Sequence, residues 1–342
     1  MARAHDPQHI LLIRPSALGD VCRTVPVLVS LRRALPSARI DWLVQDSFVD
    51  AVRAHPDVAR VVPFARGALG RAMKRGRIGE VFSYLGGLRA ERYDLVIDAQ
   101  GLLRSALIGR ASGARRRVGY ANAQECGWVF NTERHALDRS MHTVDRMLGL
   151  VERAGIAPVR DMRLYAAEED QMAARALVPE VGIVLAPTSR WAAKRWPIER
   201  FAALAERLLR ESDEPITIIG APGEEAQCGA LTALAAREPR VTNLVGRTSI
   251  GQTMAIIERS VLVAACDSAA LHMAVGFDRP IVALYGPTEV SRVGPYRREG
   301  DVIQHVTPGD KLDHKRAANV ALMERIEVDE VLAACRARLG KS

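Results

Sequence analysis

Residues 9–13 read HILLI, the loop RPSALGD follows, and residues 21–35 read VCRTVPVLVSLRRAL. The first segment is an apolar run of strand length, and the third has the spacing of a helix with one apolar side. Further apolar runs of strand length occur at Arg39–Val44 and Asp94–Ala99. Strands that alternate with helices in this way are typical of a parallel α/β sheet.

The same pattern begins again in the second half of the chain. Val181–Ala186 (VGIVLA) reads as a strand, and the amphipathic segment Ile198–Arg210 follows it. Three more strand-like runs come after: Pro215–Gly220 (PITIIG), Val261–Cys266 (VLVAAC) and Pro280–Tyr285 (PIVALY). We therefore expect an α/β protein with two Rossmann-like domains, whose parallel sheets face a central cleft.

Glycine, proline and charged residues interrupt both patterns between residues 157 and 180, which indicates a domain boundary there. We expect an N-terminal domain over residues 1–165 and a C-terminal domain over residues 166–325. Residues 326–342 are expected to form a C-terminal helix that can pack back on the first domain. In such sheets the loops after the strands are the place to look for function.

The composition excludes several classes of protein. The chain has 342 residues, of which 48% are hydrophobic and 26% charged, so wholesale disorder and a polytopic membrane protein are both disfavoured. Its net charge of +8 favours anionic partners. Aromatic residues make up only 5%, and no basic-aromatic run is present, so small anions are favoured over nucleic acid.

The five cysteines are dispersed, without a CxxC pair or a Cys/His cluster, which disfavours disulfides and a zinc site. A reducing cytoplasm is the expected compartment. The apolar run before Arg14 is too short for a signal peptide or a membrane span. We therefore expect any association with a membrane to be peripheral.

Asp20 stands where the first loop meets the first helix. A carboxylate at this point can accept hydrogen bonds from the free N–H groups of the helix start. At the rim of a cleft it can also act as a general base on an incoming hydroxyl. The loop lacks both the GxGxxG and the GK[ST] patterns, so neither a dinucleotide fingerprint nor a P-loop is present.

Three loops of the second half offer groups suited to a phosphorylated ligand. The loop 187–197 (PTSRWAAKRWP) supplies two hydroxyls and three cations, which suit a diphosphate, although a surface loop anchored by Trp196 is the ordinary interpretation. Asp267 or Ser268 can begin a helix whose free N–H groups bind an anion. The carboxylate of Glu224 can accept hydrogen bonds from sugar hydroxyls, or it can simply stabilise the first turn of a helix.

Two basic clusters lie in the first half, at Arg66–Arg77 with five cations and no acid, and at Arg110–Arg117 with four cations. Each can be a solvated surface or an anion-binding site, and the residues alone leave this open.

Several unlike motifs together resemble one family over roughly residues 9–305. They read, in order, ILLIRPSALGDVCRTVP (10–26), DLVIDAQGLLRSALIGRASGARRRVGY (94–120), PTSRWAAKRWP (187–197), IIGAPGEE (218–225), GRTS (246–249) and CDSAALHMAVGFDRPIVALYGPTEVSRVGPY (266–296). The chain resembles the ADP-heptose:lipopolysaccharide heptosyltransferases of glycosyltransferase family 9, which have the GT-B fold.

The resemblance implies an inverting transfer of L-glycero-D-manno-heptose from ADP-heptose to the inner core of lipopolysaccharide, with neither a cofactor nor a metal. Asp20 matches the catalytic base, and Lys194 the basic residue on the donor phosphates. The other donor-binding positions implied by the match are Thr188, Ser189, Glu224, Thr248, Asp267, Ser268, Ala269 and His272. Ala269 replaces the glycine usual in the family, and its methyl group could weaken donor binding.

A lipopolysaccharide acceptor is anionic and lies at a membrane surface, so the resemblance also gives the first basic cluster a function. The acceptor-binding positions expected in it are Arg66, Arg71, Lys74 and Arg75. The expected partners are thus a nucleotide-sugar donor, the lipopolysaccharide acceptor and the cytoplasmic face of the inner membrane, without nucleic acid.

Two alternatives stay open beside this interpretation. A family 9-like transferase could use another nucleotide sugar or a protein acceptor. A non-catalytic nucleotide-sugar-binding protein is the other; Ala269 favours it, whereas Asp20 and Lys194 argue against it. An NAD-dependent dehydrogenase is less favoured, because the glycine-rich turn is missing.

Overall fold

The computed structural model describes residues 7–340, and its contacts divide the chain into two compact units. Unit 1 covers Met1–Met162 and unit 2 covers Arg163–Ser342. The division therefore falls three residues before the boundary expected from the sequence.

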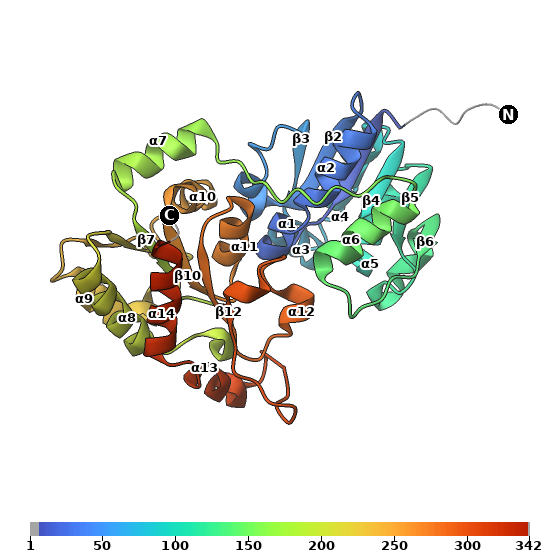
Figure 1. Cartoon of the computed structure of the whole chain (residues 1–342). Helices are drawn as coiled ribbons and strands as arrows, with labels where there is room; N and C mark the ends of the chain where they lie inside the picture. Colours follow the sequence, from blue (N-terminus) through green and yellow to red (C-terminus); the bar gives the residue numbers. More distant parts are fainter. Residues whose placement is uncertain (1–6, 341–342) are drawn as a thin grey trace. The chain divides into compact units, whose positions relative to one another are not determined.

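Unit 1 is built on a parallel six-stranded sheet in the order β3-β2-β1-β4-β5-β6 (Figure 1). Its strands are β1 (His9–Ile13), β2 (Arg39–Gln45), β3 (Arg60–Phe64), β4 (Leu95–Asp98), β5 (Arg116–Tyr120) and β6 (Glu133–His135). Its helices are α1 (Leu18–Cys22), α2 (Val25–Ala34), η1 (Asp46–Ala51), α3 (Arg66–Lys74), α4 (Ile78–Ala90), α5 (Leu103–Ala111), η2 (Gln124–Phe130) and α6 (Thr143–Arg153).

Helices cover both faces of this sheet, with α2 and α6 on one face and α4 and α5 on the other (Figure 1). The last four residues of β1 are fully buried, and Leu11 and Ile13 pack in the core beneath α4 and α5. Because successive side chains of a strand point to opposite faces, a strand covered on both faces must be apolar throughout. This burial explains why HILLI is a continuous apolar run.

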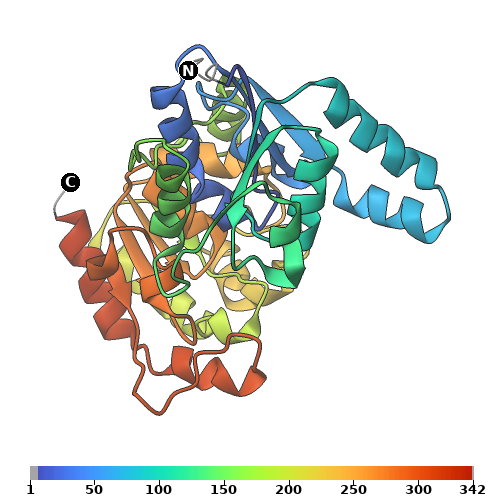
Figure 2. The same cartoon turned by 90° about the vertical axis from the view of Figure 1, so that its right-hand side faces the viewer.

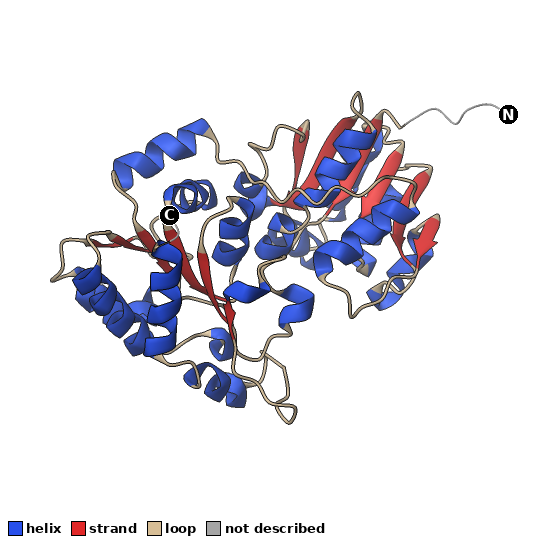
Figure 3. Ribbon diagram, in the orientation of Figure 1, coloured by secondary structure: helices blue, strands red, loops and turns tan. Residues whose placement is uncertain are grey.

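Unit 2 repeats the architecture with the parallel sheet order β12-β11-β10-β7-β8-β9 (Figure 3). Its strands are β7 (Ile183–Ala186), β8 (Ile216–Ile218), β9 (Val241–Asn243), β10 (Leu262–Cys266), β11 (Ile281–Leu284) and β12 (Val302–Ile303). Its helices are α7 (Glu168–Leu177), η3 (Ala192–Lys194), α8 (Ile198–Glu211), η4 (Glu225–Cys228), α9 (Gly229–Ala235), α10 (Ile250–Arg259), α11 (Ala269–Gly276), α12 (Val290–Val293), η5 (Glu299–Asp301), η6 (Ala317–Val320), α13 (Ala321–Glu324) and α14 (Val328–Leu339).

The two sheets share one topology, which confirms the expected fold class of two Rossmann-like α/β units. In each sheet the chain first adds strands on one side of its first strand and then continues on the other side. This switch lies between β1 and β4 in unit 1 and between β7 and β10 in unit 2. Loops that leave neighbouring strands in opposite directions open a crevice at this switch point, where such sheets bind ligands. The switch point is therefore the expected ligand-binding edge of each unit.

The C-terminal helix α14 packs in the core of unit 2. Val331, Leu332 and Cys335 of α14 are fully buried in the core that α8 covers. Trp196 fixes the preceding segment, since its indole N–H donates to the carbonyl of Ile326 at 2.9 Å. The helix packs here because its apolar side fills this face of the second sheet.

Within residues 7–340, no helix combines the length and the apolar character needed to cross a membrane. All five cysteines are free thiols, and only Cys126 among them is exposed. No disulfide therefore links the elements that the structure describes.

Replacing Leu332 by alanine tests the place of α14. We expect Leu332→Ala to lower the free energy of unfolding of unit 2 by about 2–5 kcal/mol, because it leaves a cavity in a closed core. Urea denaturation followed by tryptophan fluorescence measures this loss. The volume-conserving control Leu332→Met is expected to cost less than about 1.5 kcal/mol. Equal stability of Leu332→Ala and the wild type would contradict the assignment of α14 to this core.

Candidate functional site

Asp20 lies just beyond the carboxyl end of β1, as the third residue of α1. Its Oδ2 accepts a hydrogen bond from the N–H of Ala17 at 3.3 Å, which helps to start the helix. The same oxygen pairs with Arg14 Nη2 at 3.1 Å, and Oδ1 pairs with Arg23. Asp20 is therefore not the N-cap that the ordinary interpretation predicts, because the helix begins earlier, with Ala17 as the N-cap. Its role as a general base stays a prediction.

The two arginines control the charge of this carboxylate. Burial alone would raise the pKa of Asp20, but the guanidinium groups of Arg14 and Arg23 hold it well below its usual range. Asp20 is therefore ionised throughout the physiological pH range. Neither arginine was singled out from the sequence, because nothing there shows that both turn towards Asp20.

Asp98 is a second carboxyl group at the same switch point, and it is fully buried at the end of β4. It accepts hydrogen bonds from the N–H groups of Gln100 at 3.0 Å and Gly101 at 3.1 Å, and from the Ser105 hydroxyl at 2.9 Å. Burial nevertheless raises its pKa to about 6. Arg14 donates to the carbonyl of Ala99 next to it, so this arginine links the ends of β1 and β4.

A hollow of about 400 Å³ opens beside the carboxyl end of β2. It is lined by three of the four predicted acceptor-binding cations, together with Gln45 and two glycines: Gln45, Arg66, Gly67, Gly70, Arg71 and Lys74. The fourth cation, Arg75, follows at the end of α3 and does not line the hollow. The structure thus gathers three cations of the first basic cluster around one space of ligand size.

In the second basic cluster, Arg110–Arg117, two arginines bind other parts of unit 1 and do not line that hollow. Arg116 pairs with Glu133 at 2.5 Å, and Arg117 donates to the carbonyl of Phe130 at 2.9 Å. These arginines fasten β5 to the neighbouring segment, so we assign them a structural role.

Lys194 and Asp267 form the centre of the site in unit 2. Lys194 follows β7, Asp267 follows β10, and the two strands are neighbours in the sheet. The Lys194 Nζ lies 2.6 Å from Asp267 Oδ2, and both side chains are mostly buried. A buried lysine needs such a partner, and a bound anion can take the place of that partner.

The start of α11 adjoins this pair. Ser268 occupies the N-cap position without capping the helix, and its Oγ is buried and has no hydrogen-bond partner among the described residues. The first turn of a helix carries free N–H groups that favour an anion. Ala269 is the first helical residue and has no positive φ, so its methyl group imposes no backbone strain. His272 is buried one turn further on.

Thr188 and Ser189 are buried in the loop that leads to Lys194. Thr188 packs against Gly220, where an added Cβ would lie 3.0 Å from its Oγ1. The N–H of Ser189 donates to the side chain of Gln227 at 3.3 Å. The two hydroxyls therefore stand at the carboxyl end of β7, in the loop that carries Lys194.

Glu224 and Thr248 lie in the loops after β8 and β9, which the backbone joins through the N–H of Gly246 and the carbonyl of Gly220 at 3.0 Å. Glu224 Oε2 accepts from the N–H of Ala221 at 3.0 Å, and the Thr248 hydroxyl lies 2.8 Å from that of Thr253. Both groups make local bonds in this structure, and their donor contacts stay predictions.

Two residues near this site escaped the sequence analysis. Thr288 follows β11, and its buried Oγ1 has no hydrogen-bond partner within residues 7–340. His314 packs its ring edge-on against Trp191 with 5.4 Å between ring centres. Burial and the charge of Lys194 lower its pKa. Only the fold brings His314 to this loop cluster. Thr288 lies in the quoted segment 266–296, directly after the strand-like run Pro280–Tyr285, so its place after a strand was a usable local signal.

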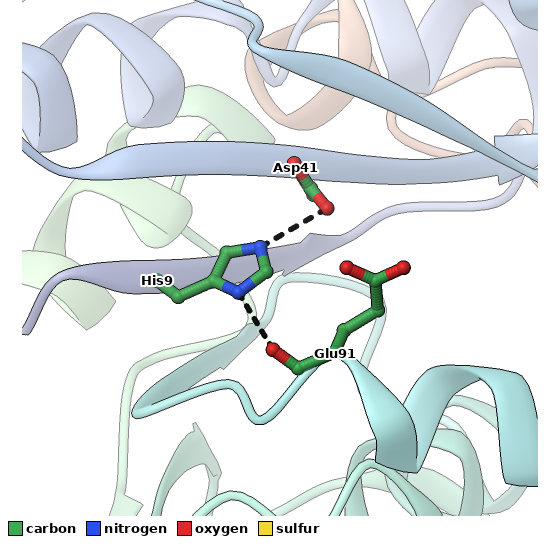
Figure 4. A group of neighbouring side chains, drawn as sticks. All are labelled: His9, Asp41 and Glu91. Carbon is green, nitrogen blue, oxygen red and sulfur yellow. Dashed lines mark hydrogen bonds and ion pairs between the residues drawn. The ribbon is translucent and has the colours of Figure 1, made fainter.

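The described residues contain one group of acids and histidine close enough to hold a metal ion, at the amino end of the first sheet: His9, Asp41 and Glu91 (Figure 4). His9 Nε2 lies 3.2 Å from the buried Asp41, and Nδ1 lies 2.9 Å from the backbone carbonyl of Glu91. Arg60 pairs with Asp41 at 2.8 Å and with Glu91 at 2.7 Å. Because a guanidinium already balances both carboxylates, we assign this group a structural role.

Comparison with known proteins gives one consistent result. The sequence pattern of glycosyltransferase family 9 (heptosyltransferase) matches residues 81–320. Lipopolysaccharide heptosyltransferase 1 of Escherichia coli O18:K1:H7 (strain RS218 / NMEC) is 28% identical over 315 residues, which cover 90% of this chain and 94% of that protein.

Two solved structures from E. coli are similar in fold. ADP-heptose lps heptosyltransferase II has a TM-score of 0.80 at 23% identity, with 97% of this chain and 99% of that one covered. Heptosyltransferase WaaC with ADP has a TM-score of 0.75 at 24% identity, with 96% and 99% covered.

Asp98 makes the stability of unit 1 depend on pH. Its pKa of about 6 in the folded protein exceeds the ordinary value of 3.8, so the folded chain holds the proton over a range where the unfolded chain releases it. This contribution is complete below pH 4 and is lost as the pH rises through 6, a change of about 3 kcal/mol.

The variant Asp98→Asn lacks this titration and can still accept the two backbone hydrogen bonds. We expect the wild type to lose stability relative to the variant between pH 4 and 6, as measured by urea denaturation at several pH values. Parallel stability profiles of the two proteins would exclude a raised pKa at Asp98.

Proposed function

Because this chain belongs to glycosyltransferase family 9, we propose that it transfers L-glycero-D-manno-heptose from ADP-heptose to the inner core of lipopolysaccharide, with inversion at the anomeric carbon. The observation that carries the proposal is the pair of Lys194 and Asp267 beside the start of α11. This arrangement offers a buried cation and free helix N–H groups to a nucleoside diphosphate. The relatives named as heptosyltransferases support the donor sugar.

In this proposal the donor diphosphate lies between Lys194 and the first turn of α11. Lys194 exchanges part of its contact with Asp267 for the phosphate oxygens, and the Ser268 and Thr188 hydroxyls complete the contacts. As the bond from the anomeric carbon to the diphosphate breaks, ADP leaves with the electron pair. Lys194 and the helix N–H groups stabilise the charge that develops, so the proposed reaction requires no metal ion.

The proposed base is Asp20. The acceptor hydroxyl attacks the anomeric carbon from the side opposite to ADP, and its proton passes to Asp20. A carboxylate paired with Arg14 and Arg23 is a weak base. It therefore takes the proton late, when the new carbon–oxygen bond has already made the hydroxyl acidic. The two arginines keep Asp20 ionised, and so able to accept a proton, at every physiological pH.

We further propose that the hollow lined by Arg66, Arg71 and Lys74 binds the acceptor. Within residues 7–340, none of these three side chains, nor that of Arg75, forms an ion pair, so their charges are available to a ligand. An inner-core acceptor is phosphorylated and anchored in a membrane, and its negative charge complements theirs. The protein would thus act at the cytoplasmic face of the inner membrane.

Lys194→Ala tests the donor site. We expect ADP to bind about ten- to a hundredfold more weakly to the variant, because a charged contact is lost and Asp267 is left to repel the phosphates. Calorimetric titration with ADP, UDP, GDP and NAD measures affinity and specificity. Arg190→Ala removes an exposed cation of the same loop and is expected to bind ADP as the wild type does.

Tight binding of UDP or NAD by both wild type and Lys194→Ala would contradict the donor assignment. Preferential ADP binding without transfer of heptose to a core acceptor would instead indicate another nucleotide sugar or a non-catalytic protein.

Asp20→Ala tests the base. Turnover of ADP-heptose is expected to fall about 10²- to 10⁴-fold, while the affinity for ADP changes little, because the donor contacts lie in unit 2. Mass spectrometry of the product measures turnover, and calorimetric titration measures the affinity for ADP. Asp46→Ala, which removes an exposed acid after the neighbouring strand β2, serves as the matched control. Full turnover by Asp20→Ala would contradict the proposed role of Asp20 as the general base.

A further inference from the structure

The exposed large apolar side chains of unit 1 occur on one connected set of helices. Within the described residues it has six of them, and all lie on α3, α4, α5 and η2: Met73, Ile78, Phe82, Leu107, Trp128 and Val129. These elements form a continuous series, since α3 contacts α4, α4 contacts α5, and α5 contacts η2. The helices on the opposite face, α2 and α6, expose none. We call this series the apolar face of unit 1.

The α3–α4 pair is its most prominent part and extends away from the first sheet (Figure 2, light blue to cyan). Residues 78–90 read IGEVFSYLGGLRA, with apolar side chains around most of the helix. Leu88, Tyr84 and Leu85 pack towards the core of unit 1. Ile78 and Phe82, one turn apart on the other side, are 56% and 70% exposed, although a surface helix normally turns polar residues outward.

Positive charge surrounds these exposed side chains. The residues of α3, α4, α5 and η2, with the 75–77 turn, include eight cations and two acids. One acid, Glu80, is already paired with Arg77 at 3.1 Å. Exposed apolar groups within a basic surface are typical of a segment that lies in the headgroup region of an anionic bilayer.

We propose that the apolar face of unit 1 docks on an anionic lipid bilayer, with Ile78 and Phe82 entering the boundary between headgroups and acyl chains. The cations of this face that do not line the acceptor hollow bind the lipid phosphates. The inference rests on the proposed function, in which the acceptor is itself anchored in that bilayer. A second copy of the chain is a poorer partner, because the face carries the same positive charge in both copies.

Vesicle binding of the full chain tests this proposal. We expect cosedimentation with vesicles of phosphatidylethanolamine and phosphatidylglycerol, release by salt, and weak binding to phosphatidylcholine alone. Trp128 is a natural reporter for this face, since Trp42 and Trp196 are fully buried and the half-buried Trp191 belongs to unit 2. Its fluorescence is expected to be quenched by phosphatidylglycerol with brominated acyl chains, and this quenching is expected to be lost in Trp128→Phe.

The double variant Ile78→Ser with Phe82→Ser is expected to bind the anionic vesicles at least about tenfold more weakly. The matched control, Met172→Ser with Leu177→Ser, changes two exposed apolar residues of α7 in unit 2 and is expected to bind as the wild type does. Circular dichroism verifies that both variants fold. Wild-type binding by the Ile78/Phe82 variant, or no preference of the wild type for anionic vesicles, would overturn the proposal.

Two further measurements separate this proposal from others. Analytical ultracentrifugation without lipid is expected to give the same mass for wild type and variant, whereas a smaller variant assembly would identify a contact between copies and overturn lipid docking. Turnover on a water-soluble, lipid-free acceptor is expected to be unchanged in the variant. Absence of this turnover in the wild type would contradict the proposed function, while the vesicle result would still decide the docking surface.

Discussion

The parallel pairing of β7 with β10 is the constraint on which the chemistry of unit 2 depends. Because the strands run in one direction, the loops that follow them begin at the same edge of the sheet. Lys194 and Asp267, 73 positions apart in the chain, therefore meet at 2.6 Å. The pairing of β1 with β4 does the same in unit 1, where it places Arg14 beside the end of the strand that carries Asp98.

Charge compensation explains how reactive groups persist at these two edges. Lys194 is balanced by Asp267, and Asp20 by Arg14 and Arg23. Such pairs hold the side chains in place and keep them ionised. The pair in unit 2 also allows exchange, because the oxygens of a bound anion can take over part of the charge compensation that Asp267 gives to Lys194. The buried carboxyl of Asp98 instead accepts three hydrogen bonds from neutral donors, and burial raises its pKa.

The two basic clusters look alike in the sequence and differ in the structure. Arg116 and Arg117 are bound to Glu133 and to backbone carbonyls, whereas Arg66, Arg71 and Lys74 line an open hollow and form no ion pair with another described residue. The difference follows from location. The former belong to β5, inside the sheet, while the latter lie on an exposed helix that contains no acid itself.

The sequence by itself determined the repeated α/β pattern, the central strands of both sheets and the loops that follow them, because strands buried on two faces must be continuous apolar runs. The strands β3, β5, β6, β9 and β12 were missed, because they are short or less completely buried and carry no such run. The motif resemblance also determined the family and supplied the candidates Asp20, Lys194 and Asp267. Tertiary structure alone decided that α14 completes the second core, that Arg14 and Arg23 set the charge of Asp20, and that His314 adjoins the second site. These outcomes depend on contacts between distant segments, which are fixed by strand order and packing and leave no local pattern in the chain.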